Sequence, residues 1–292
     1  MACCPKSIIA DILKAREDKG GIVNVYYVAC GGSYAGLHPG KYFLQSEAKK
    51  VTVDHYTANE FCHATPKALG PNSIVITQSH SGTTPETVKA AEIAQKAGAA
   101  SVVITFDDQS PLAKNGDYVL KYEAKAPADM SGMAFGLKLA VEILNQVEGY
   151  ENYDEMMNGF DRIDGIVKHA KEFLTPRAKI FAEEYKDEKL IYMMGSGANY
   201  RVAYSFAICL LMEMQWINSS AIHSGEYFHG PFEITDRETP FIILMSEGRT
   251  RPLDQRALDF LNRFAEKVIV LDAKELGLET IDDKVSEFFN PL

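Results

Sequence analysis

Several hydroxyl side chains lie between an apolar run and a helical pattern, an arrangement suited to binding a phosphate group. The run Ser73–Gln78 predicts a strand, and Pro85 opens a helical pattern. The hydroxyls between them belong to Ser79, Ser81 and Thr84. Free backbone N–H groups and the positive end of a helix dipole point at such a turn. We therefore expect a phosphate-binding loop, to which His80 contributes its backbone, and a substrate that carries a phosphate.

The elements around this loop alternate between strand and helix. Apolar runs predict strands at 23–29, 51–53, 73–78, 101–106 and 118–122. Helical patterns cover 5–19, 85–98 and 131–147, and a tight loop at 30–36 enters a helix that runs to about 49. Strands and helices joined by short turns predict a parallel sheet wrapped by helices on both faces.

The second half of the chain echoes the first. Residues 193–199 repeat 28–34 at an offset of 195 − 30 = 165, and 243–250 faintly repeat 74–84. The pattern predicts two α/β repeats, at 5–150 and 151–292, the second opening with a helical connector. The second repeat lacks hydroxyls, because Ala198 corresponds to Ser33 and Gly248 to Ser81. We therefore expect one phosphate pocket in each chain, in the first repeat.

Charge and composition argue against several classes of function. The net charge of 30 − 40 = −10 disfavours binding to nucleic acid or anionic membrane. The five cysteines have no C-x-x-C spacing, and no apolar run is long enough to cross a membrane. We expect a cytoplasmic protein with reduced thiols. Seven scattered histidines without metal-ligand spacing predict no metal, and no nucleotide or redox cofactor is implied.

These motifs resemble those of the double sugar isomerase (SIS) domain family. The turn at 79–84 resembles its Ser-x-Ser-Gly-x-Thr phosphate loop, 30–34 resembles its first loop, and 229–231 resembles the His-Gly-Pro of glucosamine-6-phosphate synthase. The resemblance implies an α/β fold of two SIS repeats, each a three-layer, flavodoxin-like sandwich. It also implies that Ser33 and Ser131 contact the sugar, and that homodimers or homotetramers share their active sites.

Within that family, the segments 211–217 and 223–232 look like those of deglycases that cleave 6-phosphorylated Amadori products. The family's catalytic pair is a Glu and a His sixteen residues apart, which Glu213 and His229 match (229 − 213 = 16). The synthase has a Lys three residues before that Glu, where this chain has Leu210. The resemblance therefore implies hydrolysis of a 6-phosphofructosyl amino acid to glucose 6-phosphate and the free amino acid.

The residue types suit this chemistry. A carboxylate can carry a proton between C1 and C2 of the open-chain sugar, and an imidazole can assist ring opening. The apolar neighbours of Glu213 would form a pocket that raises its pKa toward neutrality. Both residues also have structural interpretations: Glu213 could pair with an arginine, and His229 could cap a helix or lie in the core. Glu226 is the alternative base.

Three other functions stay open at this point. An aldose–ketose isomerase or a glucosamine-6-phosphate isomerase/deaminase would use the same scaffold. A non-catalytic sugar-phosphate-binding regulator would usually carry a DNA-binding helix-turn-helix or another partner domain, and none is visible in the sequence. The sequence also does not decide which cationic residue would bind the carboxylate of the amino acid. The candidates are Lys41, Arg201, Arg249 and Arg251.

Overall fold

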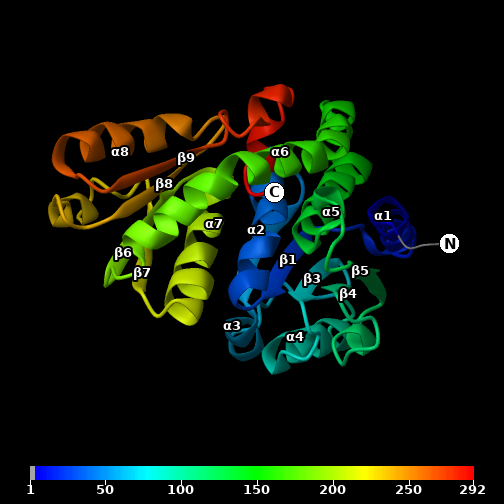
Figure 1. Ribbon diagram of the computed structural model, residues 1–292. Helices are drawn as coiled ribbons and strands as arrows, with labels where there is room; N and C mark the ends of the chain where they lie inside the picture. Colours follow the sequence, from blue (N-terminus) through cyan, green and yellow to red (C-terminus); the bar gives the residue numbers. More distant parts are fainter. Residues whose placement is uncertain (1–3) are drawn as a thin grey trace. The chain divides into compact units, whose positions relative to one another are not determined.

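A computed structural model describes residues 4–292, which form two compact α/β units, one ending at Tyr153 and the other beginning at Asp154 (Figure 1). Each unit is built around its own parallel sheet. The fold class expected from the strand–helix alternation is therefore confirmed.

The first unit contains five parallel strands in the order β2-β1-β3-β4-β5. The strands are β1 (Asn24–Ala29), β2 (Thr52–Thr57), β3 (Ser73–Ser79), β4 (Ala100–Thr105) and β5 (Tyr118–Lys121). The central strand β3 and its neighbour β4 are buried along their whole length, as expected for apolar runs covered on both faces. The strand expected at 51–53 is longer than its apolar part, because β2 runs to Thr57 beside β1.

Helices cover both faces of this sheet. They are α1 (Pro5–Lys14), α2 (Gly31–Glu47), α3 (Ala58–His63), α4 (Pro85–Lys96) and α5 (Gly132–Glu148). Figure 1 shows α3 and α4 together on one side of the sheet and α1 and α5 on the other. Gly40 of α2 lies so close to α5 that a Cβ there would be 2.4 Å from the carbonyl oxygen of Gly136. Small residues therefore set the close packing of α2 against α5.

Two expected boundaries in the first unit were wrong. The residues at 30–36 are not a loop, because α2 begins at Gly31, directly after Cys30 as its N-cap. The first helix ends at Lys14, and the rest of the expected segment forms a short 3₁₀ turn, Glu17–Lys19.

The second unit begins with a 33-residue helix, α6 (Tyr153–Tyr185), where the helical connector was expected. Its four parallel strands follow the order β7-β6-β8-β9, the order of the first four strands of the first unit. They are β6 (Leu190–Gly195), β7 (Asn218–His223), β8 (Phe241–Met245) and β9 (Val268–Asp272). The repeat inferred from the sequence is thus a repeat of sheet topology.

Two apolar clusters cover the faces of the second sheet. On one face, α6 and α7 (Tyr200–Ser205) pack with the helical segment that follows α7, and on the other, α8 (Arg251–Phe264) packs with aromatic residues at 227–232. Short 3₁₀ turns at 278–280 and 286–289 complete the chain. Within residues 4–292, none of the helices is both long enough and apolar enough to cross a membrane. Cys4, Cys30, Cys62 and Cys209 are free thiols, as expected, and Cys3 lies outside the described residues.

Candidate functional site

The expected phosphate loop lies at the point in the first sheet where the strand order reverses. Strands β2 and β3 lie on opposite sides of β1, so the switch in strand order falls between β1 and β3. Ala29 and Gln78 are paired at the carboxyl ends of these two strands. Open α/β sheets bind ligands outside the carboxyl ends of the strands at such a switch point. The loop at 79–84 and the start of α2 both lie there.

The hydroxyls of this loop are held in two pairs. Ser79 Oγ lies 3.0 Å from Thr84 Oγ1, and it accepts a hydrogen bond from the backbone N–H of Gly82 at 3.1 Å. Ser81 Oγ lies 2.8 Å from the hydroxyl of Thr83, and both of these residues are exposed. The Thr84 side chain makes no capping bond to α4 although Thr84 is its N-cap. The first-turn N–H groups of α4 and the exposed hydroxyls of Ser81 and Thr83 are therefore available to donate hydrogen bonds to an anion.

Gly82 gives the loop its shape. Its φ of +66° lies in the left-handed region that side chains disfavour. A Cβ at this position would lie 2.0 Å from the hydroxyl oxygen of Ser110. Both the dihedral angle and the close approach require glycine, which explains the Gly within the motif.

Ser33 and Ser131 both lie at the start of a helix in the first unit. Ser33 is in the first turn of α2 and is half-buried. Ser131 is the N-cap of α5, and its hydroxyl accepts a hydrogen bond from the N–H of Ala134 at 3.1 Å. Ser131 therefore has a structural role in the protein, whether or not it also contacts a sugar.

His80 takes part through its side chain as well as its backbone. Its Nδ1 lies 2.9 Å from the hydroxyl of Tyr122, and its ring stacks on Phe106. Burial raises the pKa of Tyr122, so the phenol stays protonated and can act as a donor. Neither Tyr122 nor Thr83, which lies within the loop, was predicted from the sequence. The run of hydroxyls could have indicated Thr83, but Tyr122 follows β5 and no local pattern marks it.

In the second unit, Glu213 lies on a distorted helix. Residues Phe206–Met214 continue α7 as a π-helix, and the backbone N–H of Gln215 bonds to the carbonyl of Leu210. The helix ends at Met214, and Trp216, two residues further on, has a φ of +59° and is the one described residue other than glycine with a positive φ. π-Helical turns and strained backbone are frequent at functional sites.

The apolar pocket expected around Glu213 was wrong for the single chain. Glu213 is exposed. Its apolar neighbours do not enclose it, because Met212, Met214 and Trp216 are themselves 45%, 64% and 89% exposed. Of this helical segment, Ala207 and Leu211 are buried against the sheet. The sequence pattern was apolar, but the fold directs much of it outward.

His229 and Glu226 lie in the turns between β7 and β8, and both are exposed. The backbone N–H of His229 bonds to the carbonyl of Glu226 at 2.9 Å. Within residues 4–292, no hydrogen bond or ion pair involves the side chains of Glu213, Glu226 or His229. The pairing with an arginine that was considered for Glu213 is therefore not present.

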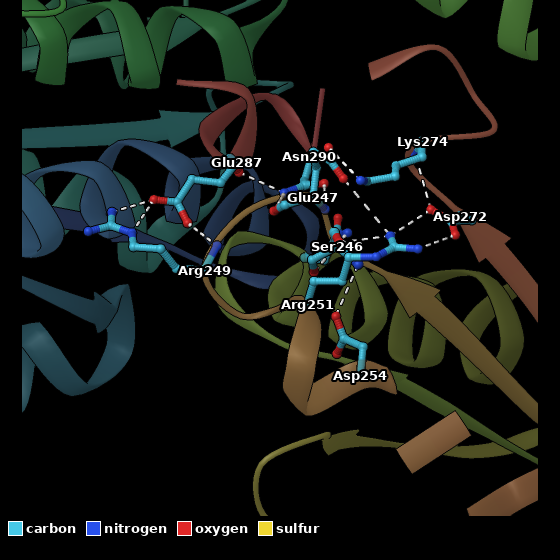
Figure 2. Close-up of polar contacts among 10 residues, drawn as sticks. Ser246, Glu247, Arg249, Arg251, Asp254, Asp272, Lys274, Glu287 and Asn290 are labelled. Atoms are coloured by element: carbon cyan, nitrogen blue, oxygen red, sulfur yellow. Dashed lines mark hydrogen bonds and ion pairs between the residues drawn. The ribbon is translucent and has the colours of Figure 1, made fainter. Parts of the chain in front are cut away.

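The loop after β8 in the second repeat differs from the loop after β3, because side chains of its own unit bond part of its backbone. Three backbone N–H groups of this loop are bonded to side-chain oxygens of the same unit: Ser246 to Asp254 at 3.0 Å, Glu247 to Asn290 at 2.8 Å, and Arg249 to Glu287 at 3.2 Å. Figure 2 shows Glu287 and Asn290 reaching the loop from the C-terminal segment. The chain's own acceptors thus bond N–H groups that could otherwise donate to an anion.

The candidate cations have partners of their own. Arg251 donates to both carboxylate oxygens of Asp272, at 2.8 and 2.6 Å, and Arg249 pairs with Glu287 (Figure 2). The guanidinium of Arg201 lies 5.4 Å and 5.1 Å from the rings of Tyr200 and Tyr204. Lys41 bonds to the side-chain oxygen of Gln45 on α2. No cation is therefore distinguished as the carboxylate partner. In the described part of the chain, no group of three His, Cys, Asp or Glu side chains could hold a metal.

Comparison with known proteins agrees with this architecture. Residues 23–146 and 184–277 match the SIS domain family. Fructosamine deglycase FrlB of Bacillus subtilis (strain 168) is 45% identical over 273 residues, 93% of this chain and 83% of that protein. Fructoselysine 6-phosphate deglycase of Escherichia coli (strain K12) is 26% identical over 93% of this chain and 78% of that protein.

A crystal structure of a candidate phosphosugar isomerase from Salmonella typhimurium LT2 superposes with a TM-score of 0.94. It is 47% identical and the match covers 98% of this chain and 88% of that one. The segments that match the SIS domain family include the loop after β3, the π-helix and the turn that carries His229. The chain belongs to the SIS domain family.

Proposed function

We propose that this protein is a fructosamine-6-phosphate deglycase, which hydrolyses a 6-phosphofructosyl amino acid to glucose 6-phosphate and the free amino acid. The observation that carries the proposal is an exposed, unpaired carboxylate, Glu213, at the end of a π-helix and three residues before Trp216, which has a positive φ. The similarity to fructosamine deglycase FrlB supports the choice of substrate.

The first unit binds the phosphate in this proposal. The exposed hydroxyls at 81 and 83 and the N-terminus of α4 form a polar cradle at the switch point of the sheet. The site needs little positive charge, because N–H groups and a helix dipole neutralise the phosphate locally. The bound phosphate fixes the far end of the sugar, which turns the later proton transfers into steps within one complex.

The second unit supplies the reacting groups. His229 assists ring opening by moving a proton between the anomeric hydroxyl and the ring oxygen. Glu213 removes a proton from C1 and returns one to C2. Over the same step the C2 carbonyl oxygen takes up a proton and the nitrogen loses one, so the C2 ketone becomes an alcohol and the C1–N single bond becomes an imine. Water adds to C1, the C1–N bond breaks, and the amine leaves with the electron pair after it takes up a proton. Glu226 is the alternative base for the same transfer.

We also propose that the protein is a homodimer or higher homo-oligomer in which a second copy covers the π-helix. Large apolar side chains rarely stay exposed together without a partner surface. Those on this helix and just beyond its end are Leu210, Met212, Met214 and Trp216. Covering them would also remove water from Glu213. Sedimentation of the wild type and of Met214→Glu tests this, since a wild-type monomer at micromolar concentration contradicts it.

A coupled assay tests the function. Release of glucose 6-phosphate from several 6-phosphofructosyl amino acids is followed for the wild type and for Glu213→Gln, with Glu226→Gln as the matched comparison. We expect Glu213→Gln to lower kcat by about 10²–10⁴-fold and Glu226→Gln to change it far less. The reverse order assigns the proton transfer to Glu226. Turnover of fructose 6-phosphate or glucosamine 6-phosphate, without any deglycase activity, would refute the proposal.

A further inference from the structure

Several buried polar atoms among the described residues of the first unit form no hydrogen bond, and the amide oxygen of Gln78 is one of them. Gln78 is the next-to-last residue of β3, directly before the phosphate loop, and is 7% exposed. Its amide oxygen is fully buried and forms no hydrogen bond within residues 4–292. The backbone of Gln78 is paired normally with Ala29 and Ile104, so the missing partner is that of the side-chain oxygen.

The amide lies between the two helices that begin beside the candidate sugar site. It packs against glycines of both: a Cβ on Gly36 of α2 would lie 3.3 Å from the amide nitrogen, and a Cβ on Gly132 of α5 would lie 2.9 Å from it. Gly36 is one turn below Ser33, and Gly132 directly follows Ser131. Ser33 and Ser131, the two expected sugar contacts, therefore lie close in sequence to the glycines that pack against this amide.

The surroundings of the amide also include the phenol that contacts the phosphate loop. The ring of Tyr122 approaches the same position on Gly132, at 3.1 Å, and its hydroxyl reaches His80. The amide is thus adjacent to a side chain of the loop's own network. Gln78 points to the face of the sheet covered by α2 and α5, whereas the next residue, Ser79, points to the opposite face and binds within the loop.

A buried amide oxygen without a partner is unfavourable. Most buried polar groups in folded proteins are hydrogen-bonded, and an apolar side chain of the same shape would avoid the cost. A glutamine amide carries two donors and one acceptor, and a half-turn about its last bond exchanges its two ends. It can therefore donate to or accept from a neutral hydroxyl, which itself does both. Without a charge it is poorly suited to a phosphate.

We propose that Gln78 determines specificity for the sugar by binding one of its hydroxyl groups, separately from the phosphate loop. The inference rests on the proposed function, because it assumes that the first unit holds a phosphosugar. It explains why the chain keeps an amide where the packing alone favours an apolar residue. It also explains the glycines at 36 and 132, since a side chain at either position would collide with the amide or displace it.

The test compares two ligands on the full-length protein by calorimetric titration: inorganic phosphate and glucose 6-phosphate. The variants are Gln78→Met and Gln78→Leu, which keep the volume and remove the polar atoms. The matched control is Thr77→Val, which removes a buried hydroxyl on the opposite face of the same strand, where it bonds only weakly to a backbone carbonyl at 3.5 Å.

We expect both Gln78 variants to bind glucose 6-phosphate about tenfold more weakly, the loss of one or two neutral hydrogen bonds. Phosphate affinity should change less than twofold, and the melting temperature should stay equal or rise. Thr77→Val should leave both affinities unchanged.

Equal losses for both ligands would indicate a general structural effect and overturn the inference, as would unchanged affinity for glucose 6-phosphate. The wild type tests the proposed function separately. If it binds neither ligand, the phosphosugar site itself is refuted, and the role of Gln78 with it.

Discussion

Removing Glu287 should loosen the loop that follows β8 and open it to an anion. The buried carboxylate accepts hydrogen bonds from the backbone N–H of Arg249 at 3.2 Å and from its Nε at 2.6 Å. The guanidinium is 58% exposed, so its part of the pairing contributes about 1 kcal/mol at most. The backbone hydrogen bond contributes about 1 kcal/mol more. We therefore expect Glu287→Ala to lower the free energy of unfolding by about 2 kcal/mol.

The measurement is thermal unfolding with and without phosphate at neutral pH. A loss of this size corresponds to a fall in melting temperature of about 4–8 °C. Glu287→Gln keeps an acceptor oxygen and should lose about half as much. Added phosphate should stabilise Glu287→Ala more than the wild type, because the freed backbone N–H and guanidinium of Arg249 can bind it. Glu279→Ala, an exposed change in the same C-terminal region, is the control.

The reasoning would be refuted if Glu287→Ala melted at the wild-type temperature. It would also be refuted if phosphate stabilised wild type and variant equally. The second result would mean that the loop after β8 has no anion-binding capacity even when it is open.

Three further changes have defined outcomes. Gly82→Ala should weaken phosphate binding by at least tenfold in a titration and destabilise the protein by about 2 kcal/mol, because a positive φ and the nearby hydroxyl both oppose a Cβ. Gly40→Ala should cost about 1–3 kcal/mol in chemical denaturation, whereas Gly165→Ala, with open space around it in α6, should be neutral or stabilising by up to about 1 kcal/mol. Burial acts to raise the pKa of Asp272, but hydrogen bonds and charges from its arginine and lysine neighbours outweigh it and hold that pKa below the usual 3.8. The stabilisation from ionised Asp272 is therefore complete above about pH 4 and is lost as the pH falls through the lowered pKa. On acidification below pH 4, the melting temperature of Asp272→Asn should therefore fall less steeply than that of the wild type.

The sequence predicted most of the architecture because the relevant signals are local. Apolar runs and helical patterns identified nearly every element of the first unit, and short connections between them required parallel strands. The hydroxyl-rich turn after β3 was visible for the same reason, since its strand, turn and helix N-terminus are contiguous in the chain. The boundary after Cys30 was misjudged because glycines there suggested a loop, although α2 begins at Gly31 and packs through Gly40.

The surroundings of single side chains could not be predicted from local sequence patterns. The apolar neighbours of Glu213 suggested a pocket, but a hydrophobic residue in a helix is buried only if another element covers that face. Nor does a local pattern indicate the π-helix or the positive φ of Trp216, which depend on how the helix packs against its sheet. Exposure at this helix is decided by packing, not by composition.

The sequence by itself determined two parallel α/β repeats, a hydroxyl-rich loop after β3 and the residue types available for proton transfer. Only the tertiary structure decided which groups are satisfied and which are free. It brings Glu287 and Asn290 back to the loop after β8, about forty residues away in the chain, and occupies two N–H groups there. It also buries the amide of Gln78 between two glycine-bearing helices, where its oxygen has no partner within residues 4–292. Hydrogen-bond satisfaction depends on atoms distant in sequence, so no local periodicity can encode it.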